Sequence, residues 1–258
     1  MTGVRIAAVR LNCPDPARTA AFYAAAFDAA LSPRADGVAA ALGDQCLDLV
    51  RTGAPCSDPA VANSVAFQHC AIVVTDMAAA YARLRGVPGW SAISRAGPER
   101  LPASSGGVTA FKFRDPDGHP LEFLAFPSCP PAWTGRTGLV LGIDHSAITV
   151  SDSARSVAFY EGLGFTVANR GLNRGEEQAR MDAVAAPVVE VTGLRPPGGG
   201  PMNLELLCYR EPGALAAALS DDDPLATRLV LTGPSGPSSD PDGHWLAWEP
   251  ALGEGPTP

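Results

Sequence analysis

Apolar and polar residues alternate in several short stretches of the chain, and two of these stretches repeat one another. Residues 69–76 (HCAIVVTD) and 145–152 (HSAITVSD) share the pattern H-x-A-I-x-V-x-D. The alternation predicts a strand. The closing aspartate predicts a helix N-cap, because its carboxylate accepts hydrogen bonds from unpaired backbone N–H groups and complements the helix dipole. Each stretch is therefore expected to run from a strand into a helix.

A third copy of this pattern starts at Ala8. Asp15 precedes Phe22 and Tyr23 by the same step as Asp152 precedes the Phe-Tyr pair at 159–160. The modules that begin near Ala8 and His145, the first and third along the chain, are therefore interpreted as close relatives.

Two identical turns, DPDGH at 115–119 and at 240–244, each precede an apolar stretch. Proline and glycine set a tight connection, so each turn is expected to lead into a strand and to close one repeat. The histidines of these turns, His119 and His244, are expected to stabilise the turn.

Four repeat starts, short helices and paired terminal strands predict four β-α-β-β-β modules and an α+β fold with mixed sheets. The segment 213–219 is helix-like, but few strand residues follow it, so the fourth module is expected to be shortened. The expected domains are 1–127 (modules 4–52 and 66–127) and 141–252 (module 141–209 and a truncated module 213–250), joined by a Pro-rich linker at 128–140.

Composition narrows the possible partners. The 258 residues are 46% hydrophobic, enough for two ordinary cores, and 27 Asp+Glu outnumber 19 Lys+Arg. Without a basic stripe, neither nucleic acid nor an anionic membrane is expected to bind, which leaves a small molecule as the expected partner. No secretory signal and no run of about 20 apolar residues is visible, so a cytoplasmic location is predicted.

The cysteines show no paired CxxC spacing, which argues against a zinc knuckle or a redox motif. Reduced, mostly buried thiols are expected instead. The six cysteines are Cys13, Cys46, Cys56, Cys70, Cys129 and Cys208.

With these motifs, the chain resembles the vicinal oxygen chelate superfamily of glyoxalases, bleomycin-resistance proteins and extradiol dioxygenases. The DPDG turn before a strand that ends in Glu122, together with the strand that bears His69, carries the resemblance. It covers nearly the whole chain except the linker and the shortened module. The resemblance implies tandem modules paired into two curved mixed sheets, with ligands on their first and last strands. A fold of this kind does not choose among reactions.

Strand periodicity predicts an unusually polar inward face in the first domain. Such charges normally persist only when they are paired or functional. The residues expected there are Arg10, Asn12, Asp48, His69, Lys112 and Glu122.

The ligand positions implied by the resemblance fall on Ala8, Asp48, His69 and Glu122. A divalent ion (Mn, Fe, Ni or Zn) is therefore expected on His69, Glu122 and Asp48, with His69 and Glu122 as the catalytic pair. In the second domain only His145 and Glu205 match, while Thr227 and Ala247 fill the other positions, so that domain is interpreted as a degenerate scaffold. A 2-His-1-carboxylate set would require modules two and three to pair.

Arg10, Lys112 and Asn12 are expected to bind substrate, since a guanidinium or an ammonium can bind a carboxylate, phosphate or enolate. Purely structural roles stay open. His69 could be a hydrogen-bonded core histidine, and Glu122 could form a buried salt bridge to Arg10 or Lys112.

These expectations describe a metal-dependent lyase, isomerase or dioxygenase that acts on a small oxygen-rich substrate in the N-terminal domain. A metal-free binding or resistance protein that sequesters its ligand is the alternative. A metal-free acid–base enzyme is a third possibility. Either a monomer or a homodimer is compatible with the sequence.

Overall fold

The first two modules contain most of the expected elements. The computed structural model describes residues 3–54, 58–200, 202–233 and 235–250. Module one comprises β1 (Arg5–Cys13), α1 (Pro16–Phe27), β2 (Ala30–Arg34), β3 (Gly37–Leu42) and β4 (Gln45–Arg51). Module two comprises β5 (Gln68–Val74), α2 (Met77–Arg85), β6 (Ser91–Ala92), β7 (Glu99–Arg100), η1 (Ala103–Ser105), β8 (Thr109–Arg114) and β9 (Pro120–Ala125).

A short 3-10 helix, η2 (Pro131–Trp133), lies in the linker, and the last two modules follow it. Module three comprises β10 (Val140–Thr149), α3 (Ser153–Gly162), β11 (Thr166–Arg174), α4 (Glu176–Asp182), β12 (Val188–Arg195) and β13 (Asn203–Glu211). In the described part of module four, the strands are β14 (Arg228–Thr232) and β15 (Trp245–Glu249).

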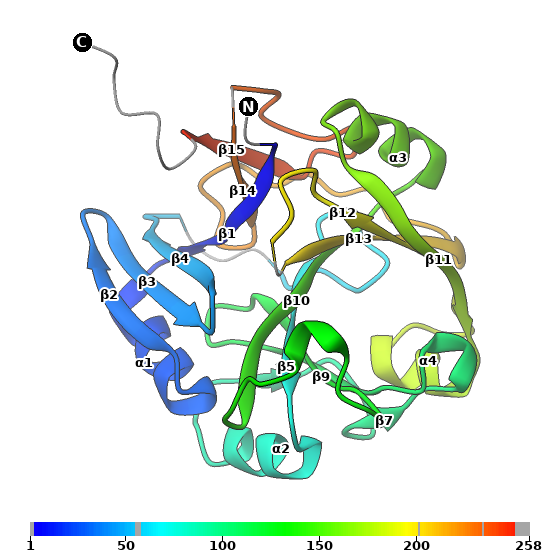
Figure 1. Ribbon diagram of the computed structural model, residues 1–258, viewed down its shortest axis with the longest axis horizontal. Helices are drawn as coiled ribbons and strands as arrows, with labels where there is room; N and C mark the ends of the chain where they lie inside the picture. The colour runs from blue at the N-terminus through cyan, green and yellow to red at the C-terminus, as the bar shows by residue number, and fades with distance from the viewer. Residues whose placement is uncertain (1–2, 55–57, 201, 234, 251–258) are drawn as a thin grey trace.

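These strands form two mixed sheets (Figure 1). The six-stranded sheet has the order β15-β14-β1-β4-β3-β2, and the nine-stranded sheet has the order β11-β12-β13-β10-β5-β9-β8-β6, with β7 on β8. Module one thus pairs with module four, and module two pairs with module three. The expectation that modules one and two share a sheet and a cavity is wrong, because β5 pairs with β10 and β1 pairs with β14. The predicted boundaries at 1–127 and 141–252 remain a division of the sequence that the sheets do not follow.

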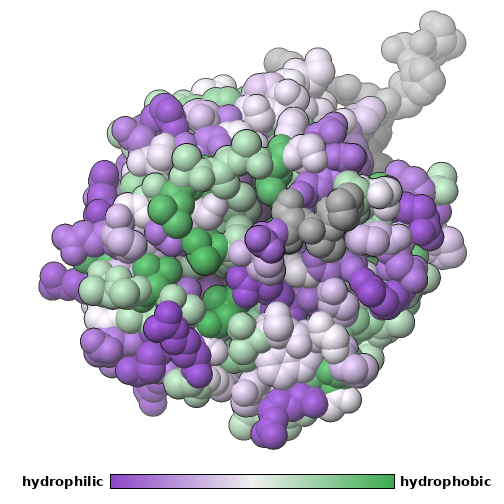
Figure 2. Space-filling model, turned by 180° about the vertical axis from the view of Figure 1, so that it is seen from behind, coloured by the Kyte–Doolittle hydropathy of each residue, from purple (hydrophilic) through white to green (hydrophobic). Residues whose placement is uncertain are grey.

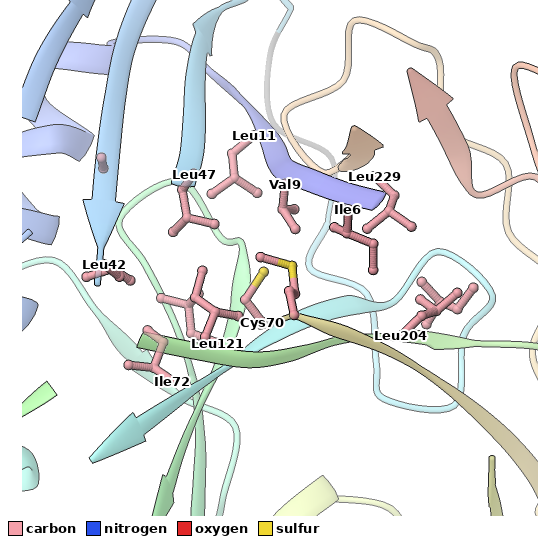
Figure 3. Close-up of a cluster of buried hydrophobic side chains, with 14 of the residues drawn as sticks. Ile6, Val9, Leu11, Leu42, Leu47, Cys70, Ile72, Leu121, Leu204 and Leu229 are labelled. Carbon is pink, nitrogen blue, oxygen red and sulfur yellow. The ribbon is translucent and has the colours of Figure 1, made fainter. Parts of the chain in front are cut away.

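One continuous hydrophobic core lies between the two sheets. In Figure 3, Val9, Leu47 and Leu229 extend from the six-stranded sheet toward Ile72 and Leu121 of the nine-stranded sheet. All five are buried. The other face of each sheet is therefore the one free to carry a polar site.

The packing of Ile6 differs from the simple alternation of β1. The alternation predicts that Ile6 faces away from the core, together with Arg10, but Ile6 is 8% exposed and belongs to the core. A register shift between Ile6 and Ala8 in the pairing with β14 accounts for this difference, because one extra residue reverses the side to which the preceding side chains point.

The predicted helix caps are present. The side chains of Asp15, Asp76 and Asp152 each accept a hydrogen bond from backbone N–H groups of the first turn of α1, α2 and α3. Each cap ends a strand and fixes the direction of the following helix.

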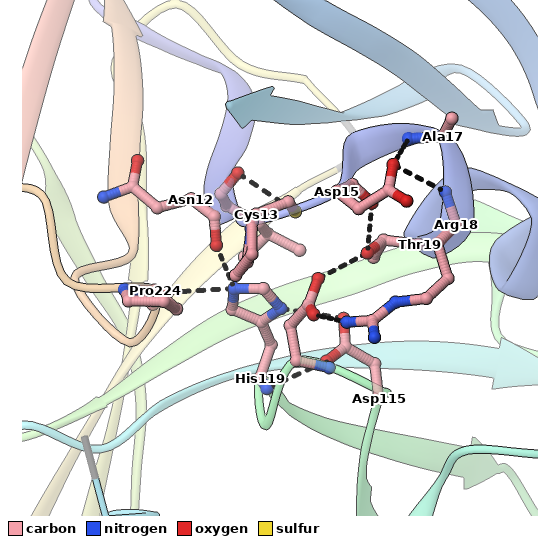
Figure 4. Close-up of polar contacts among 12 residues, drawn as sticks. Asn12, Cys13, Asp15, Ala17, Arg18, Thr19, Asp115, His119 and Pro224 are labelled. Carbon is pink, nitrogen blue, oxygen red and sulfur yellow. Dashed lines mark hydrogen bonds and ion pairs between the residues drawn. The ribbon is translucent and has the colours of Figure 1, made fainter. Parts of the chain in front are cut away.

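The first DPDGH turn connects module two to module one across the core (Figure 4). His119 Nε2 lies 3.0 Å from the carbonyl oxygen of Asn12 and 2.9 Å from that of Pro224, and its Nδ1 lies 2.7 Å from Asp115 Oδ2. The hydroxyl of Tyr23 on α1 donates to the same carboxylate over 3.1 Å. His119 is a structural residue of the turn, as expected.

The second turn makes the equivalent connection from module four to module three. His244 Nε2 lies 2.8 Å from the carbonyl oxygen of Thr149, and Tyr160 on α3 donates to Asp240 over 3.3 Å. Arg155 binds Asp242 over 2.6 Å. Modules one and two, and likewise modules three and four, are thus linked between sheets rather than within one sheet.

Module four is shortened, but not as predicted in every detail. Among the residues that the structure describes between β14 and β15, it lacks the helix and two strands of a full module. The helix-like segment 213–219 is not helical, because the backbone of Leu215 bonds to Asn63 and Val65 instead and forms a bridge to Ser64.

The surface is chemically mixed. Figure 2 shows hydrophilic and hydrophobic residues interspersed over the face seen from behind. No helix of the described residues is long and apolar enough to cross a membrane. Five cysteines have free thiols, and Cys56 lies outside the described residues.

Candidate functional site

A cavity of about 430 Å³ lies on the face of the nine-stranded sheet that points away from the core. Modules two and three both line it, with η1 and α4 among the lining elements. Ser105 in η1 donates to Asn173 on β11 over 2.8 Å, which joins the two modules at the cavity. Its charged and imidazole-bearing lining residues are His69, Lys112, Glu122, Asp144, His145, Arg170 and Glu205.

The pairing of β5 with β10 brings two histidines to the centre of this face. His69 lies opposite Ala147, and His145 lies opposite Ala71. The flanking strands β9 and β13 run parallel to them and place Glu122 opposite Ala71 and Glu205 opposite Ala147. Because the residues between these side chains are alanines, two imidazoles and two carboxylates meet without steric obstruction.

The distances among these groups are short. His69 Nε2 lies 2.9 Å from Glu122 Oε2, and His145 Nε2 lies 3.5 Å from Glu205 Oε2. The ligand atoms offered by His69, Glu122 and His145 all lie within 4.8 Å of one another, and all three residues are buried. On the far side of its ring, His145 Nδ1 lies 2.9 Å from Asp144 Oδ2, which fixes the ring orientation.

His69 is buried in the wall of this cavity without hydrogen bonds to its ring from the described part of the chain. Both of its ring nitrogens are buried, and neither has a hydrogen-bond partner among the described residues, since its contact with Glu122 does not have hydrogen-bond geometry. A buried polar atom without a partner is costly. A cation bound by the imidazole would satisfy it, so the residues present fit a divalent ion.

The surroundings of the two imidazoles shift their pKa values in opposite directions. Burial lowers the pKa of His69 to about 4, and the Lys112 charge acts in the same direction. Burial also opposes a charge on His145, but Glu205 and Asp144 outweigh it and raise the pKa of His145 to about 9.

The two glutamates differ in the same way. Burial favours the neutral form of Glu122, but Lys112 and His69 outweigh it and lower its pKa to about 2. Burial raises the pKa of Glu205, and its side chain keeps 25% exposure. Glu122 is therefore the firmly ionised carboxylate, and Glu205 is the one closer to accepting a proton.

Lys112 lies beside this group on β8, directly opposite Glu122. Its ammonium donates to Asp182 Oδ1 over 2.7 Å and lies 3.9 Å from Glu122 Oε2. Asp182 also accepts 2.7 Å hydrogen bonds from Gln178 and Tyr209. This buried network connects β8 of module two to α4 and β13 of module three.

Of the predicted site residues, the structure brings together His69, Glu122 and Lys112 but not the remaining three. Arg10 and Asp48 lie on the six-stranded sheet, 3.8 Å apart, and Arg10 binds Glu249 over 3.1 Å. Asn12 donates to the carbonyl oxygens of residues 221 and 223. The expected cavity that combined all six residues does not exist, because module one pairs with module four.

The six-stranded sheet repeats the arrangement without the ligands. By register, Ala8 corresponds to His69 and Asp48 to Glu122. Arg228 and Ala247 take the places of His145 and Glu205. The third of these positions, expected at Thr227, lies one residue later, at Arg228. These four positions keep a carboxylate but no imidazole, so they offer no comparable metal site.

A second cluster of potential ligands, formed by Cys13, Asp117 and His119, has another explanation. Both ring nitrogens of His119 are engaged in the turn contacts of Figure 4, and Asp117 bonds to Arg18 and Thr19. Burial raises the pKa of the Cys13 thiol, which keeps it protonated. This cluster holds the turn rather than a metal ion.

His145 and Glu205, expected in a separate and degenerate second domain, belong to the same site as His69 and Glu122. The repeated H-x-A-I-x-V-x-D pattern was the signal that could have joined them to His69 and Glu122. Two strands with the same sequence pattern, β5 and β10, lie side by side at the centre of the sheet.

Comparison with known proteins places the chain within one family. A family model described as the Glyoxalase/Bleomycin resistance protein/Dioxygenase superfamily matches residues 5–123 and 142–247. None of the curated proteins matches the chain in a sequence search.

Solved structures of glyoxalase I from Zea mays share the fold. One of them is 17% identical with a TM-score of 0.60, and the match covers 89% of this chain and 74% of that chain. A mutant of the same enzyme is 17% identical with a TM-score of 0.57, covering 89% of this chain and 76% of that chain. At this identity the likeness establishes the fold and not the reaction.

Proposed function

Because the chain belongs to the Glyoxalase/Bleomycin resistance protein/Dioxygenase superfamily, we propose that it is a divalent-metal-dependent lyase or isomerase whose small substrate binds through two neighbouring oxygens. The observation that carries this proposal is the convergence of two imidazoles and two carboxylates from four strands in one cavity. This donor set suits Mn²⁺, Fe²⁺, Ni²⁺ or Zn²⁺. A bound ion of this kind would supply a Lewis acid that polarises a substrate oxygen.

The protein's own groups would divide the remaining work. His69, His145 and Glu122 would hold the ion, with Asp144 orienting the ring of His145 through its Nδ1. Glu205 would hold and move a proton at its cavity-facing carboxylate, since burial raises its pKa and its contact with His145 is the loosest of the set. Glu122, which the sequence suggested as one of the catalytic pair, would remain an ionised ligand.

One observation favours ring-cleaving dioxygenase activity as a second candidate. The tightest cluster consists of His69, His145 and Glu122, which is a set of two imidazoles and one carboxylate. Glu205→Gln discriminates between the candidates. It should abolish lyase or isomerase turnover, but it should leave oxygen uptake by iron-loaded protein with a catechol substrate largely intact.

Metal analysis of untagged protein, stripped with chelator and reloaded, tests the proposal. We expect about one ion per chain in the wild type and in Asp48→Ala, and almost none in His145→Ala. Asp48 is the matched control, because it occupies the ligand-equivalent position on the other sheet. A wild type that retains no metal would leave metal-free sequestration as the better description.

A further inference from the structure

Lys112 is the only lysine in the chain, whose other side-chain cations are arginines and histidines. It is 2% exposed and lines the cavity of the candidate site. Asp182, which binds its ammonium, and Tyr209, which donates to Asp182, do not line the cavity. Lys112 is thus anchored by a residue outside the cavity, while Lys112 itself forms part of the cavity wall.

The ammonium of Lys112 has more N–H donors than there are acceptor atoms within hydrogen-bonding distance of it. It carries three N–H groups. Among the described residues only Asp182 accepts a hydrogen bond from it, at 2.7 Å, because Glu122 Oε2 at 3.9 Å is too distant. Two donors of a buried charged group are therefore left for an acceptor that occupies the cavity.

A purely structural link between β8 and α4 does not account for this arrangement. α4 is already joined to module two nearby by Arg180, whose guanidinium binds Glu99 on β7 through two hydrogen bonds. Lysine differs from arginine in presenting a compact point charge with freely directed donors. A compact charge suits a site where one oxygen must be bound close to other ligands.

We propose that Lys112 binds a negatively charged oxygen of the substrate, so that the substrate class is small carboxylates with a neighbouring hydroxyl or carbonyl oxygen. Glu122 Oε2 lies 3.9 Å from Lys112 Nζ and 2.9 Å from His69 Nε2. A substrate oxygen bound by the Lys112 ammonium would therefore lie next to the proposed metal ligands His69 and Glu122, where the chelating oxygens of the substrate would bind. The inference rests on the proposed metal-dependent function and narrows its substrate.

A chain with one lysine allows a direct test. Lysine labelled with ¹³C at Cε gives a single Lys112 signal in the NMR spectrum of the whole protein. Zinc-loaded protein is titrated with oxalate and, in parallel, with oxamide, which has the same skeleton but no charge. We expect oxalate to shift the Lys112 signal at saturation and oxamide to leave it in place.

Variants provide an independent measurement by calorimetry. Lys112→Met leaves the buried charge of Asp182 without a counter-charge and can unfold the protein. The main variant is therefore Lys112→Met combined with Asp182→Asn. We expect this double variant to bind oxalate about tenfold more weakly or worse, with zinc affinity nearly unchanged. Arg170→Met, which removes an exposed cation of the same cavity, should have a much smaller effect.

The outcomes separate this inference from the proposed function. If zinc and oxalate bind but the Lys112 signal does not move, or if Arg170→Met causes the larger loss, the inference is overturned and the metal site stands. If zinc does not bind, the proposed function fails. The oxalate titration of metal-free protein then decides the role of Lys112: a shift supports anion binding, and no shift overturns it.

Discussion

The imidazole rings of His69 and His145 lie 5.8 Å apart, centroid to centroid, although they belong to different modules of the chain. Both occupy the same position of the repeated pattern, and the antiparallel pairing of β5 with β10 brings them together. The candidate site therefore spans the boundary between the two sequence domains. Neither half of the chain holds it alone.

Removing Asp144 should weaken metal binding without removing a ligand. Its carboxylate lies 2.9 Å from His145 Nδ1 and fixes the ring so that Nε2 faces the cavity. We expect Asp144→Ala to bind Zn²⁺ about 10- to 100-fold more weakly, as measured by competition with a chromophoric chelator. Asp48→Ala is the control, and equal affinities in the two variants would contradict the orienting role.

The His119 turn should make stability depend on pH. Asp115 outweighs the effect of burial and raises the folded-state pKa of His119 above its ordinary value of 6.5. When the pKa of a histidine is higher in the folded than in the unfolded protein, its protonation stabilises the folded state. This contribution is complete below the unfolded-state pKa and is lost as the pH rises through the folded-state pKa. In urea unfolding from about pH 6 to about pH 9, His119→Gln should lose most stability, relative to wild type, at the acid end. A difference that is independent of pH would refute this linkage.

The two turns should contribute similar and separable stability. Tyr23 and Tyr160 donate to Asp115 and Asp240 at equivalent places, over 3.1 and 3.3 Å. Replacing either tyrosine by phenylalanine should reduce the free energy of unfolding by about 1 kcal/mol. Because the two sites are distant, the double variant should lose the sum of the two effects. Denaturant titration measures all three variants, and strong non-additivity would show that the turns are coupled.

Gly142 should tolerate no side chain. Its φ is +144°, and a Cβ would lie 2.3 Å from Gln45 Oε1, which accepts a hydrogen bond from the backbone N–H of Ile143. We expect Gly142→Ala to lower the free energy of unfolding by more than about 1 kcal/mol. Gly171→Ala on β11 is the matched control, since no atom lies within 4 Å of its Cβ position. Equal melting temperatures for the two variants would contradict this account.

Local patterns predicted the local structure well. The aspartates at 15, 76 and 152 cap helices, and each DPDGH turn leads into a strand, because these features depend on a few neighbouring residues. His69, Glu122 and Lys112 were also found from alternation along their strands. These sequence patterns are set within a single helix, turn or strand, so they do not depend on which strand pairs with it.

The choice of partner strand was not predictable in the same way. Asp48 satisfies the alternation of β4 as well as Glu122 satisfies that of β9, yet the two residues lie on different sheets. Modules one and two do touch, as do modules three and four, but through the turns at His119 and His244 rather than through strand pairing. Two modules that are neighbours in sequence can thus either pair within one sheet or face each other across the core. The periodicity within a strand does not distinguish these two arrangements.

The single core between the sheets links stability in one half of the molecule to chemistry in the other. The six-stranded sheet has alanine at two of the four ligand positions, yet its leucines pack directly beneath the strands that bear His69 and Glu122. At those four positions its outward face carries no comparable ligand set, whereas its inward face forms half of the shared core. A harmful substitution can therefore arise far from any reacting group, and a sheet without ligands can still be indispensable to the site on the other sheet.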